Sequence, residues 1–236
     1  MALPFFYIEN YIPNQSLITL TEEESKHIIT VLRMKVGEQM HLTDGGGNLL
    51  TAEIMDAHKK KCVVKVIATN SILPPAYNVT VAVSLLKNTS RFEWLLEKIT
   101  EIGVSEIIPL ICTRTERQAF RRDRMKNILV SAMLQSQQCR LPVLREPTAF
   151  NDLVASRFEN YNKLIAHCSQ DEKSSLLNRE KFKLSHFLIL IGPEGDFTQE
   201  EITSALDHQF VPVSLGDTRL RTETAGVVAA TLLTIK

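Results

Sequence analysis

The stretch that most constrains the fold lies near the end of the chain, and its first half begins with a continuous apolar run at residues 187–191. Such a run is typical of a strand that is buried on both faces. It ends in the turn 192–195, of sequence GPEG, which neither a helix nor a strand would carry. Thr198 then opens a helix, and with Glu201 it forms a predicted capping box. The pattern predicts a strand, a glycine loop and a helix in succession.

The second half of this stretch repeats the arrangement. A short apolar strand is predicted at residues 213–215, and it stops at Gly216. The loop 217–221 leads into a last helix from about Thr222. Ligands of parallel α/β sheets bind outside the carboxyl ends of the strands. The two glycine loops therefore predict a ligand site.

Composition narrows the class of protein. The 236 residues suffice for one large or two small domains, and 44% apolar with 23% charged residues is ordinary for a globular protein. Four widely spaced cysteines and six histidines without metal-ligand spacing predict reduced thiols and no metal site. We expect a cytoplasmic protein with no membrane segment, because the chain starts without a basic signal region and has no apolar run long enough to cross a bilayer.

A pair of prolines, Pro74-Pro75, marks the predicted domain boundary. Residues 1–72 read as a small β-barrel, with strands at 38–42, 49–56 and 62–69 and a hairpin turn at 44–47. A short helix is expected at 25–32, with Ile28, Ile29 and Leu32 on one side.

Residues 73–236 alternate strand and helix, which predicts an α/β domain with a parallel sheet. The helix at 91–102 is amphipathic, and Gly103 is its expected left-handed cap. Further strands are expected at 79–84, 106–111 and 163–166, and a second helix at 125–138.

Basic residues are concentrated between Thr113 and Arg145. Eight of them stand against two acidic residues, a local excess of +6 in a chain of zero net charge. One interpretation is a solvated face with scattered ion pairs. The other is a track for the phosphates of a nucleic acid, for which arginine is well suited.

The glycine loops match no common phosphate-binding or hydrolase pattern. GxxxxGK[ST], GxGxxG and GxSxG are all absent between a strand and a helix. Glycines at 192, 195 and 216 suggest backbone lying close to a flat, mostly uncharged ligand such as an adenine ring.

Side chains in these loops leave alternatives open. Glu194 either binds a ligand or holds its turn, and Thr222 is expected to cap the last helix. Arg221 is a cation before a helix N-terminus, so it needs an anionic partner: Glu223, Glu194 or a bound anion. The small face of this helix predicts close helix packing or a subunit interface.

Five segments, in the expected order along the chain, resemble one family. The family is that of the bacterial 16S ribosomal RNA uridine-N3 methyltransferases, of the SPOUT or α/β-knot superfamily. The similar segments are KHIITVLRMKVGEQMHLTDGGG, LLEKITEIGVSEIIPL, ILVSAMLQSQQCRLPVL, LIGPEGDFTQEEI and SLGDTRLRTETA. The resemblance implies a PUA-like RNA-binding barrel in residues 1–72 and a knotted methyltransferase domain in 73–236. It also implies S-adenosyl-L-methionine as cofactor, and a homodimer that acts on 16S ribosomal RNA or the small ribosomal subunit.

The resemblance also implies site residues. Carried over by position, the cofactor would be bound by Leu190, Ile191, Gly192, Glu194, Gly195, Leu215, Gly216, Leu220, Arg221, Thr224 and Ala225. Arg221 would stabilise the charge that develops on uracil, and Glu223 would act as a base or hold Arg221. The flanking RNA would lie on Arg33, Lys35, Arg114, Arg117, Arg121, Arg122 and Arg140.

Departures from the family pattern fall at several places, which include Lys26, where a histidine is common, and residues 138–140, where the family's arginine is displaced by a residue or two. Asp196 stands where a second glycine usually follows GPEG, and we expect it to cap the next helix or complement its dipole. Leu134 stands where a glutamate is usual. The alternative functions are a SPOUT methyltransferase with another RNA target and a non-catalytic RNA-binding or ribosome-assembly module.

Overall fold

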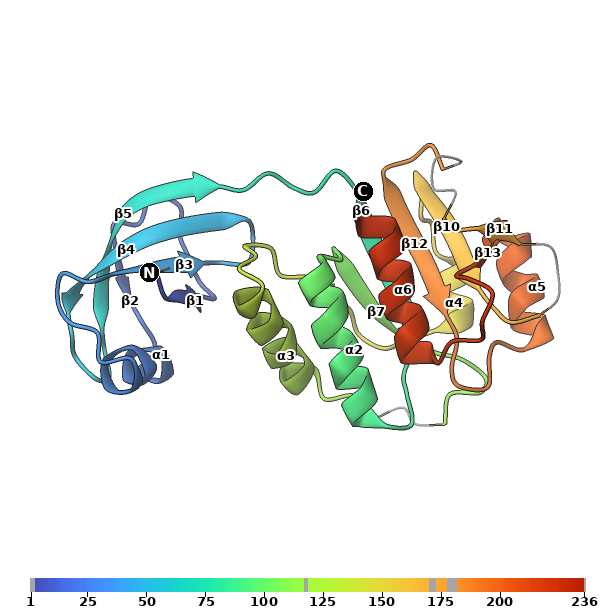
Figure 1. Ribbon diagram of the computed structural model, residues 1–236, viewed down its shortest axis with the longest axis horizontal. Coiled ribbons are helices and arrows are strands. Elements are labelled where there is room, and N and C mark those ends of the chain that lie inside the picture. Colours follow the sequence, from blue (N-terminus) through green and yellow to red (C-terminus); the bar gives the residue numbers. More distant parts are fainter. Residues whose placement is uncertain (1–2, 117–118, 170–172, 178–181, 236) are drawn as a thin grey trace. The chain divides into compact units, whose positions relative to one another are not determined.

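The computed structural model describes residues 3–116, 119–169, 173–177 and 182–235 (Figure 1). The chain forms two compact units. The first comprises Met1–Pro74 and Met133–Leu141, and the second comprises Pro75–Ala132 and Pro142–Lys236. The first break lies between the two prolines of the predicted boundary. Met133–Leu141, in contrast, joins the first unit although the sequence pattern places it in the second.

The first unit contains a five-stranded sheet in the order β1-β3-β4-β5-β2. Its long strands are β3 (Gln39–Thr43), β4 (Asn48–Asp56) and β5 (Val63–Ser71), which pair antiparallel as the hairpin turn predicts. The edge strands β1 (Phe5–Tyr7) and β2 (Leu17–Thr19) have three residues each. Such short strands carry too little alternation to be predicted from sequence.

The core of this unit lies on one face of the sheet. Alternate residues of β4 point into it, and the hydrophobic cluster continues through the strands on either side. The helical segment closes the cluster with Ile28, which is fully buried.

The expected helix at 25–32 is wrong in its bounds and at Leu32. Helix α1 (Glu22–Lys26) begins after the Thr21 cap and runs into a π-helical turn, His27–Val31. Leu32 N donates to His27 O at 3.0 Å, an i→i+5 bond. The wider turn rotates Leu32 away from the core, so that it is 44% exposed.

The second unit contains a parallel sheet in the order β11-β13-β10-β12-β6-β7-β8, with β9 also paired to β7. The five strands that the sequence predicts for this sheet are present. Strand β12 lies between β10 and β6, and Phe187 to Leu190 have no exposure at all, as a strand buried on both faces requires. These strands are β6 (Asn78–Ser84), β7 (Glu106–Ile111), β10 (Tyr161–Ala166), β12 (His186–Ile191) and β13 (Val211–Ser214).

Three strands of this sheet and one helix were not expected from the sequence. The strands β8 (Val143–Leu144), β9 (Thr148–Ala149) and β11 (Ser174–Ser175) have two residues each, and α4 (Phe150–Ala155) has six. Elements this short show no periodicity of their own, so they form because neighbouring elements fix their backbones.

The longer helices hold the loops of the sheet in place. Asn88 caps α2 (Thr89–Ile102), which ends at Gly103 with φ 97° as predicted. The other helices are α3 (Arg122–Gln135), α5 (Gln199–Asp207) and α6 (Thr222–Thr234). Helix α3 starts three residues earlier than the apolar stripe predicts, because its first turn is polar.

Helix α6 lies against α2, β6 and β12 (Figure 1). Its small residues Gly226, Ala229 and Ala230 are buried within this chain. A Cβ atom at Gly226 would lie 2.8 Å from Leu95 Cδ1, so the backbone of α6 approaches α2 as closely as glycine permits. The small face therefore serves close helix packing.

In the described part of the chain, no helix has the length and apolar character needed to cross a membrane.

Candidate functional site

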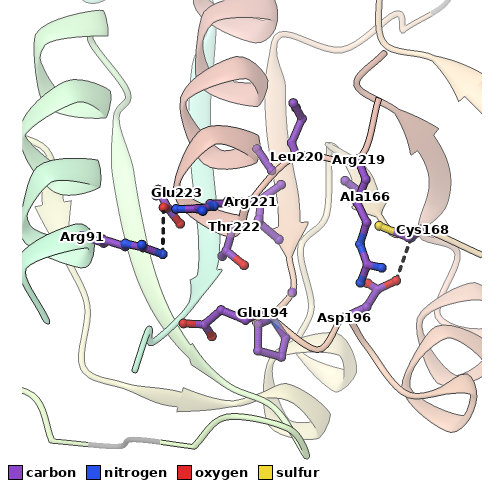
Figure 2. Close-up of a pocket in the computed structure, with 14 residues that line it drawn as sticks. Arg91, Ala166, Cys168, Glu194, Asp196, Arg219, Leu220, Arg221, Thr222 and Glu223 are labelled. Atoms are coloured by element: carbon purple, nitrogen blue, oxygen red, sulfur yellow. Dashed lines mark hydrogen bonds and ion pairs between the residues drawn. The ribbon is translucent and has the colours of Figure 1, made fainter. Parts of the chain in front are cut away.

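A pocket of about 430 Å³ lies where β10 and β12 end and α6 begins (Figure 2). Three segments of the second unit line it: residues 191–194 and Asp196 at and after the end of β12, residues 219–223 and Ala225 before and within α6, and Ala166 and Cys168 at and after the end of β10. Arg91 of α2 completes the lining. The two predicted glycine loops thus meet at one site, as the strand-end argument expects.

A second hollow of about 380 Å³ adjoins the first and shares Ala166, Cys168, Arg219, Leu220 and Ala225 with it. Residues 213–220 form most of its wall. Gly216 has φ 144°, and a Cβ atom there would meet nothing within 4 Å. The backbone at this glycine therefore faces open space.

The cofactor residues implied by the resemblance divide between these hollows. Ile191, Gly192, Glu194 and Arg221 line the first, Leu215 and Gly216 line the second, and Leu220 and Ala225 line both. Three residues line neither: Leu190 is fully buried in the core, Thr224 is exposed on α6, and Gly195 accepts a hydrogen bond from Arg114 through its carbonyl.

The turn after β12 is shaped by close contacts. A Cβ atom at Gly192 would lie 3.1 Å from Phe197 Cδ2 and 3.2 Å from Phe197 N, so a larger residue would push the turn open. The backbone then turns back, and Asp196 N donates to Pro193 O at 2.9 Å.

Asp196 adopts φ 63°, the left-handed conformation that favours glycine. This explains why the family usually has glycine here. The expectation that Asp196 adds a cap to α5 is wrong, because its carboxylate accepts from no backbone N–H of that helix. Its carboxylate instead accepts from Cys168 N at 2.8 Å and Phe197 N at 2.9 Å, which ties the loop after β12 to the end of β10.

Glu194 has a structural partner. Its Oε1 accepts from Lys87 N at 3.2 Å, just before α2, while the carboxylate remains exposed in the pocket. Of the two roles left open by the sequence, the structure provides the contact that holds the turn.

The predicted capping box of α5 is confirmed, and its glutamate has a further role. Glu201 is 5% exposed; its Oε2 accepts from Thr198 N and its Oε1 from Thr113 N, both at 2.8 Å. Burial, followed by the nearby Glu201 charge, raises the pKa of Cys112 to about 12, so this thiol stays protonated.

Helix α6 begins differently from the expectation. Thr222 is its first helical residue rather than its cap; the cap position is Arg221, which makes no side-chain capping bond. Among the described residues Arg221 forms no ion pair, whereas Glu223, 8% exposed, pairs with Arg91 Nη1 at 3.6 Å (Figure 2). The two residues proposed for the chemistry are therefore not each other's partners.

Sequence reasoning missed several residues that line the pocket, among them Ala166, Cys168, Arg219 and, from a helix outside the two loops, Arg91. Arg91 lies on the first turn of α2, where an exposed arginine is typical of an ordinary solvated helix surface. No local pattern indicates its role, because its partner Glu223 lies on the last helix.

The basic stretch is partly neutralised by carboxylates from outside it. Arg122 pairs with Glu146 at 2.6 Å, Arg124 with Glu93 at 2.5 Å, and Arg145 with Glu106. The hydrogen bond from Arg124 holds the pKa of Glu93 below its ordinary value. Three of the eight counted cations therefore have acidic partners that the sequence window excluded.

The remaining RNA-contact predictions fall in several environments. Arg33, Lys35 and Arg121 are exposed, and Arg117 lies outside the described residues. Arg114 Nη1 donates to Gly195 O at 2.6 Å, which holds the glycine loop. Arg140 donates to the Gly46 and Ile72 carbonyls at 3.0 and 2.7 Å, so it braces the first unit.

Metal ligands are not gathered anywhere in the ranges that the structure describes: no three histidine, cysteine, aspartate or glutamate side chains lie together in a way that could hold an ion.

The fold and the pocket define the second unit as a parallel α/β domain with its ligand site at the strand ends. Residues 74–234 match the family described as RNA methyltransferase domain, and residues 20–67 match the RNA methyltransferase PUA domain. The chain belongs to this RNA methyltransferase family.

Relatives match the chain over nearly its whole length. A ribosomal RNA small subunit methyltransferase E from Synechocystis is 30% identical over 91% of this chain and 72% of its own. The crystal structure of a probable rRNA-methyltransferase from Porphyromonas gingivalis is 38% identical, with a TM-score of 0.89 and 98% of each chain covered. A ribosomal RNA small subunit methyltransferase E from Neisseria gonorrhoeae, bound to S-adenosyl methionine, is 26% identical, with a TM-score of 0.85 over 97% of this chain and 95% of its own.

Proposed function

We propose that this protein transfers a methyl group from S-adenosyl-L-methionine to N3 of a uridine in 16S ribosomal RNA of the small subunit. The observation that carries the proposal is that both glycine loops and the start of α6 line two adjoining hollows, in a chain of which 97% aligns with a cofactor-bound relative. The choice of uridine N3 rests on the family segments of the sequence.

The residues present fit this cofactor. Gly216 faces open space without a side chain, and Gly192 brings backbone to the wall of the adjoining pocket. Backbone N–H and C=O groups recognise the edge of a purine without needing charged side chains. When bound, the cofactor supplies a methyl group on a positively charged sulfur, which is a ready electrophile.

The side chains of the pocket act on the acceptor. The uracil ring nitrogen becomes a good nucleophile only as it loses its proton, so negative charge develops on the ring. Arg221 has no carboxylate partner among the described residues and stands at the start of α6, where the helix dipole adds positive potential. It therefore stabilises that charge. Glu223 is held by Arg91, which leaves Arg221 available.

The RNA is bound by exposed cations of both units. Arg33, Lys35 and Arg121 retain this role in our proposal because they are exposed. The target base must leave its stack to enter the pocket. Because the proposed substrate is ribosomal, we propose that the reaction takes place in the cytoplasm. The trefoil knot and the homodimer stay predictions. Light scattering of the purified protein would test the homodimer.

Calorimetry with S-adenosylmethionine tests the cofactor. We expect saturable binding to the wild type and to Arg221→Ala, and loss of binding in Gly216→Leu, whose side chain would enter the open space. Absence of saturable binding to the wild type would favour a non-catalytic RNA-binding module.

Two measurements test the reaction and the substrate. Arg221→Ala should lose about 10²-fold or more in methyl transfer, as does removal of one donor to a developing anion elsewhere. Mass mapping of ribosomal RNA from a strain lacking the protein should show loss of the N3-methyluridine of 16S RNA. Persistence of that nucleotide with loss of another methylation would assign a different RNA target.

A further inference from the structure

We propose that Arg91 is a positioning residue: it holds Glu223 and thereby keeps this carboxylate from pairing with Arg221. The inference rests on the proposed function, because it concerns the guanidinium that would face the uracil. It assigns a role to α2, a helix outside the two glycine loops.

The first observation is the burial of Glu223. Its side chain is 10% exposed, and a carboxylate so enclosed needs a cation or hydrogen-bond donors. Arg91 Nη1 lies 3.6 Å from its Oε1, and this is the ion pair of Glu223 within the described residues (Figure 2). Both residues line the same pocket as Arg221.

The second observation is that packing fixes the position of Arg91. One turn further along α2, the buried Leu95 packs against α6 at Gly226, where an added Cβ atom would lie 2.8 Å from Leu95 Cδ1. The start of α2 is held as well, since Asn88 caps it and Lys87 N donates to Glu194. Contacts on both sides of Arg91 therefore fix the first turn of α2 beside α6: the Leu95 contact follows it in the sequence, and the bonds of Lys87 and Asn88 precede it.

The third observation is the charge balance of the pocket. Three carboxylates line it, and each has a partner: Glu194 accepts from Lys87 N, Asp196 from Cys168 N, and Glu223 pairs with Arg91. Without Arg91, Glu223 would remain as a buried charge. Arg221 is then the cation nearest in sequence, on the same end of α6, so the two would pair and Arg221 would be neutralised.

Arginine-selective labelling tests this pairing without substrate or cofactor. Phenylglyoxal modifies unpaired guanidinium groups, and mass spectrometry with peptide fragmentation quantifies modification at Arg221 separately from that at Arg219, which lies two residues before it. We expect Arg91→Met to lower Arg221 modification about fivefold or more, as pairing with a buried carboxylate implies. The double variant Arg91→Met/Glu223→Gln should return modification to the wild-type level. Arg157→Met, which removes an exposed arginine outside the pocket, is the matched control and should change nothing.

Methyl transfer provides the second readout. Arg91→Met should lower the rate of methyl transfer about tenfold or more. The double variant with Glu223→Gln should have a rate within about threefold of that of Glu223→Gln alone, because a neutral amide no longer pairs with Arg221. A double variant as impaired as Arg91→Met would overturn the proposal and indicate that Arg91 contacts the RNA directly. Unchanged labelling of Arg221 in Arg91→Met would overturn it as well.

Two controls keep the outcomes distinct. Arg91→Lys preserves the positive charge and should label Arg221 as the wild type does; reduced labelling in this variant would contradict the proposal even if Arg91→Met did not fold. A wild-type protein that binds cofactor but transfers no methyl group would refute the proposed function, while the labelling experiment would still decide whether Arg91 holds Glu223.

Discussion

Asp196 provides a test of how the two loops of the pocket are joined. Its φ of 63° costs most L-residues about 1–2 kcal/mol, and aspartate less. Its carboxylate accepts from Cys168 N and Phe197 N at 2.8 and 2.9 Å. A substitution series can separate these two contributions, because alanine, glycine and asparagine differ in which of them they retain.

The magnitudes follow from the two terms. Asp196→Ala loses two hydrogen bonds of about 1 kcal/mol each and raises the cost of the left-handed backbone by about 1 kcal/mol, so the free energy of unfolding should fall by about 3 kcal/mol. Asp196→Gly loses the same bonds but relieves the backbone, with a partly offsetting entropy cost, for about 2 kcal/mol. Asp196→Asn keeps one acceptor oxygen and the tolerance for positive φ, so the free energy of unfolding should fall by only about 1 kcal/mol.

Urea unfolding followed by tryptophan fluorescence measures these values. Trp94 is the single tryptophan of the chain and lies in α2, within the same unit as Asp196. The expected order of destabilisation is alanine, then glycine, then asparagine. A glycine variant as unstable as the alanine variant would refute the argument from backbone conformation, and an asparagine variant as unstable as either would refute the argument from the acceptor oxygen.

Two further predictions concern groups beside the pocket. Glu201→Ala should lower the free energy of unfolding by about 3 kcal/mol in the same assay, because it leaves Thr113 N and Thr198 N without their acceptor. Thr198→Ala should lower it by about 1 kcal/mol. Equal losses in the two variants would show that the hydrogen bond from Thr113 N contributes nothing. Burial first and the Asp196 charge second raise the pKa of Cys168. Alkylation of this exposed thiol by iodoacetamide should therefore reach its midpoint at a pH above that of a free cysteine, and Asp196→Asn should lower the midpoint; mass spectrometry across a pH series decides both.

The central strand could be predicted because its sequence carries the whole signal. Burial on both faces requires an unbroken apolar run, and β12 has one. The glycine loops were predictable for the same local reason, since a turn with GPEG continues no regular element. The two-residue strands were not, because their pairing depends on neighbours that a local pattern does not contain.

The charge track shows the limit of a sequence window. The partners of Arg124 and Arg145 are Glu93 and Glu106, which precede the counted stretch and lie near it only in the folded chain. The role of Arg91 was hidden for a similar reason: its partner Glu223 belongs to the last helix, and no periodicity relates the two. Local patterns found the loops, while the side chains that pair across elements required the fold.

Helix packing and pocket chemistry are connected through α6. The small side of α6 allows close packing, because Gly226 has no side chain to keep Leu95 of α2 at a distance. The same approach brings Glu223 within 3.6 Å of Arg91, about one turn away along both helices. An alanine at position 226 would place its Cβ atom 2.8 Å from Leu95 Cδ1, so either this buried side chain or the helix must shift. A shift of the helix would lengthen the ion pair between Arg91 and Glu223 although position 226 is not part of the pocket lining, which connects the packing of α6 to the charges of the pocket.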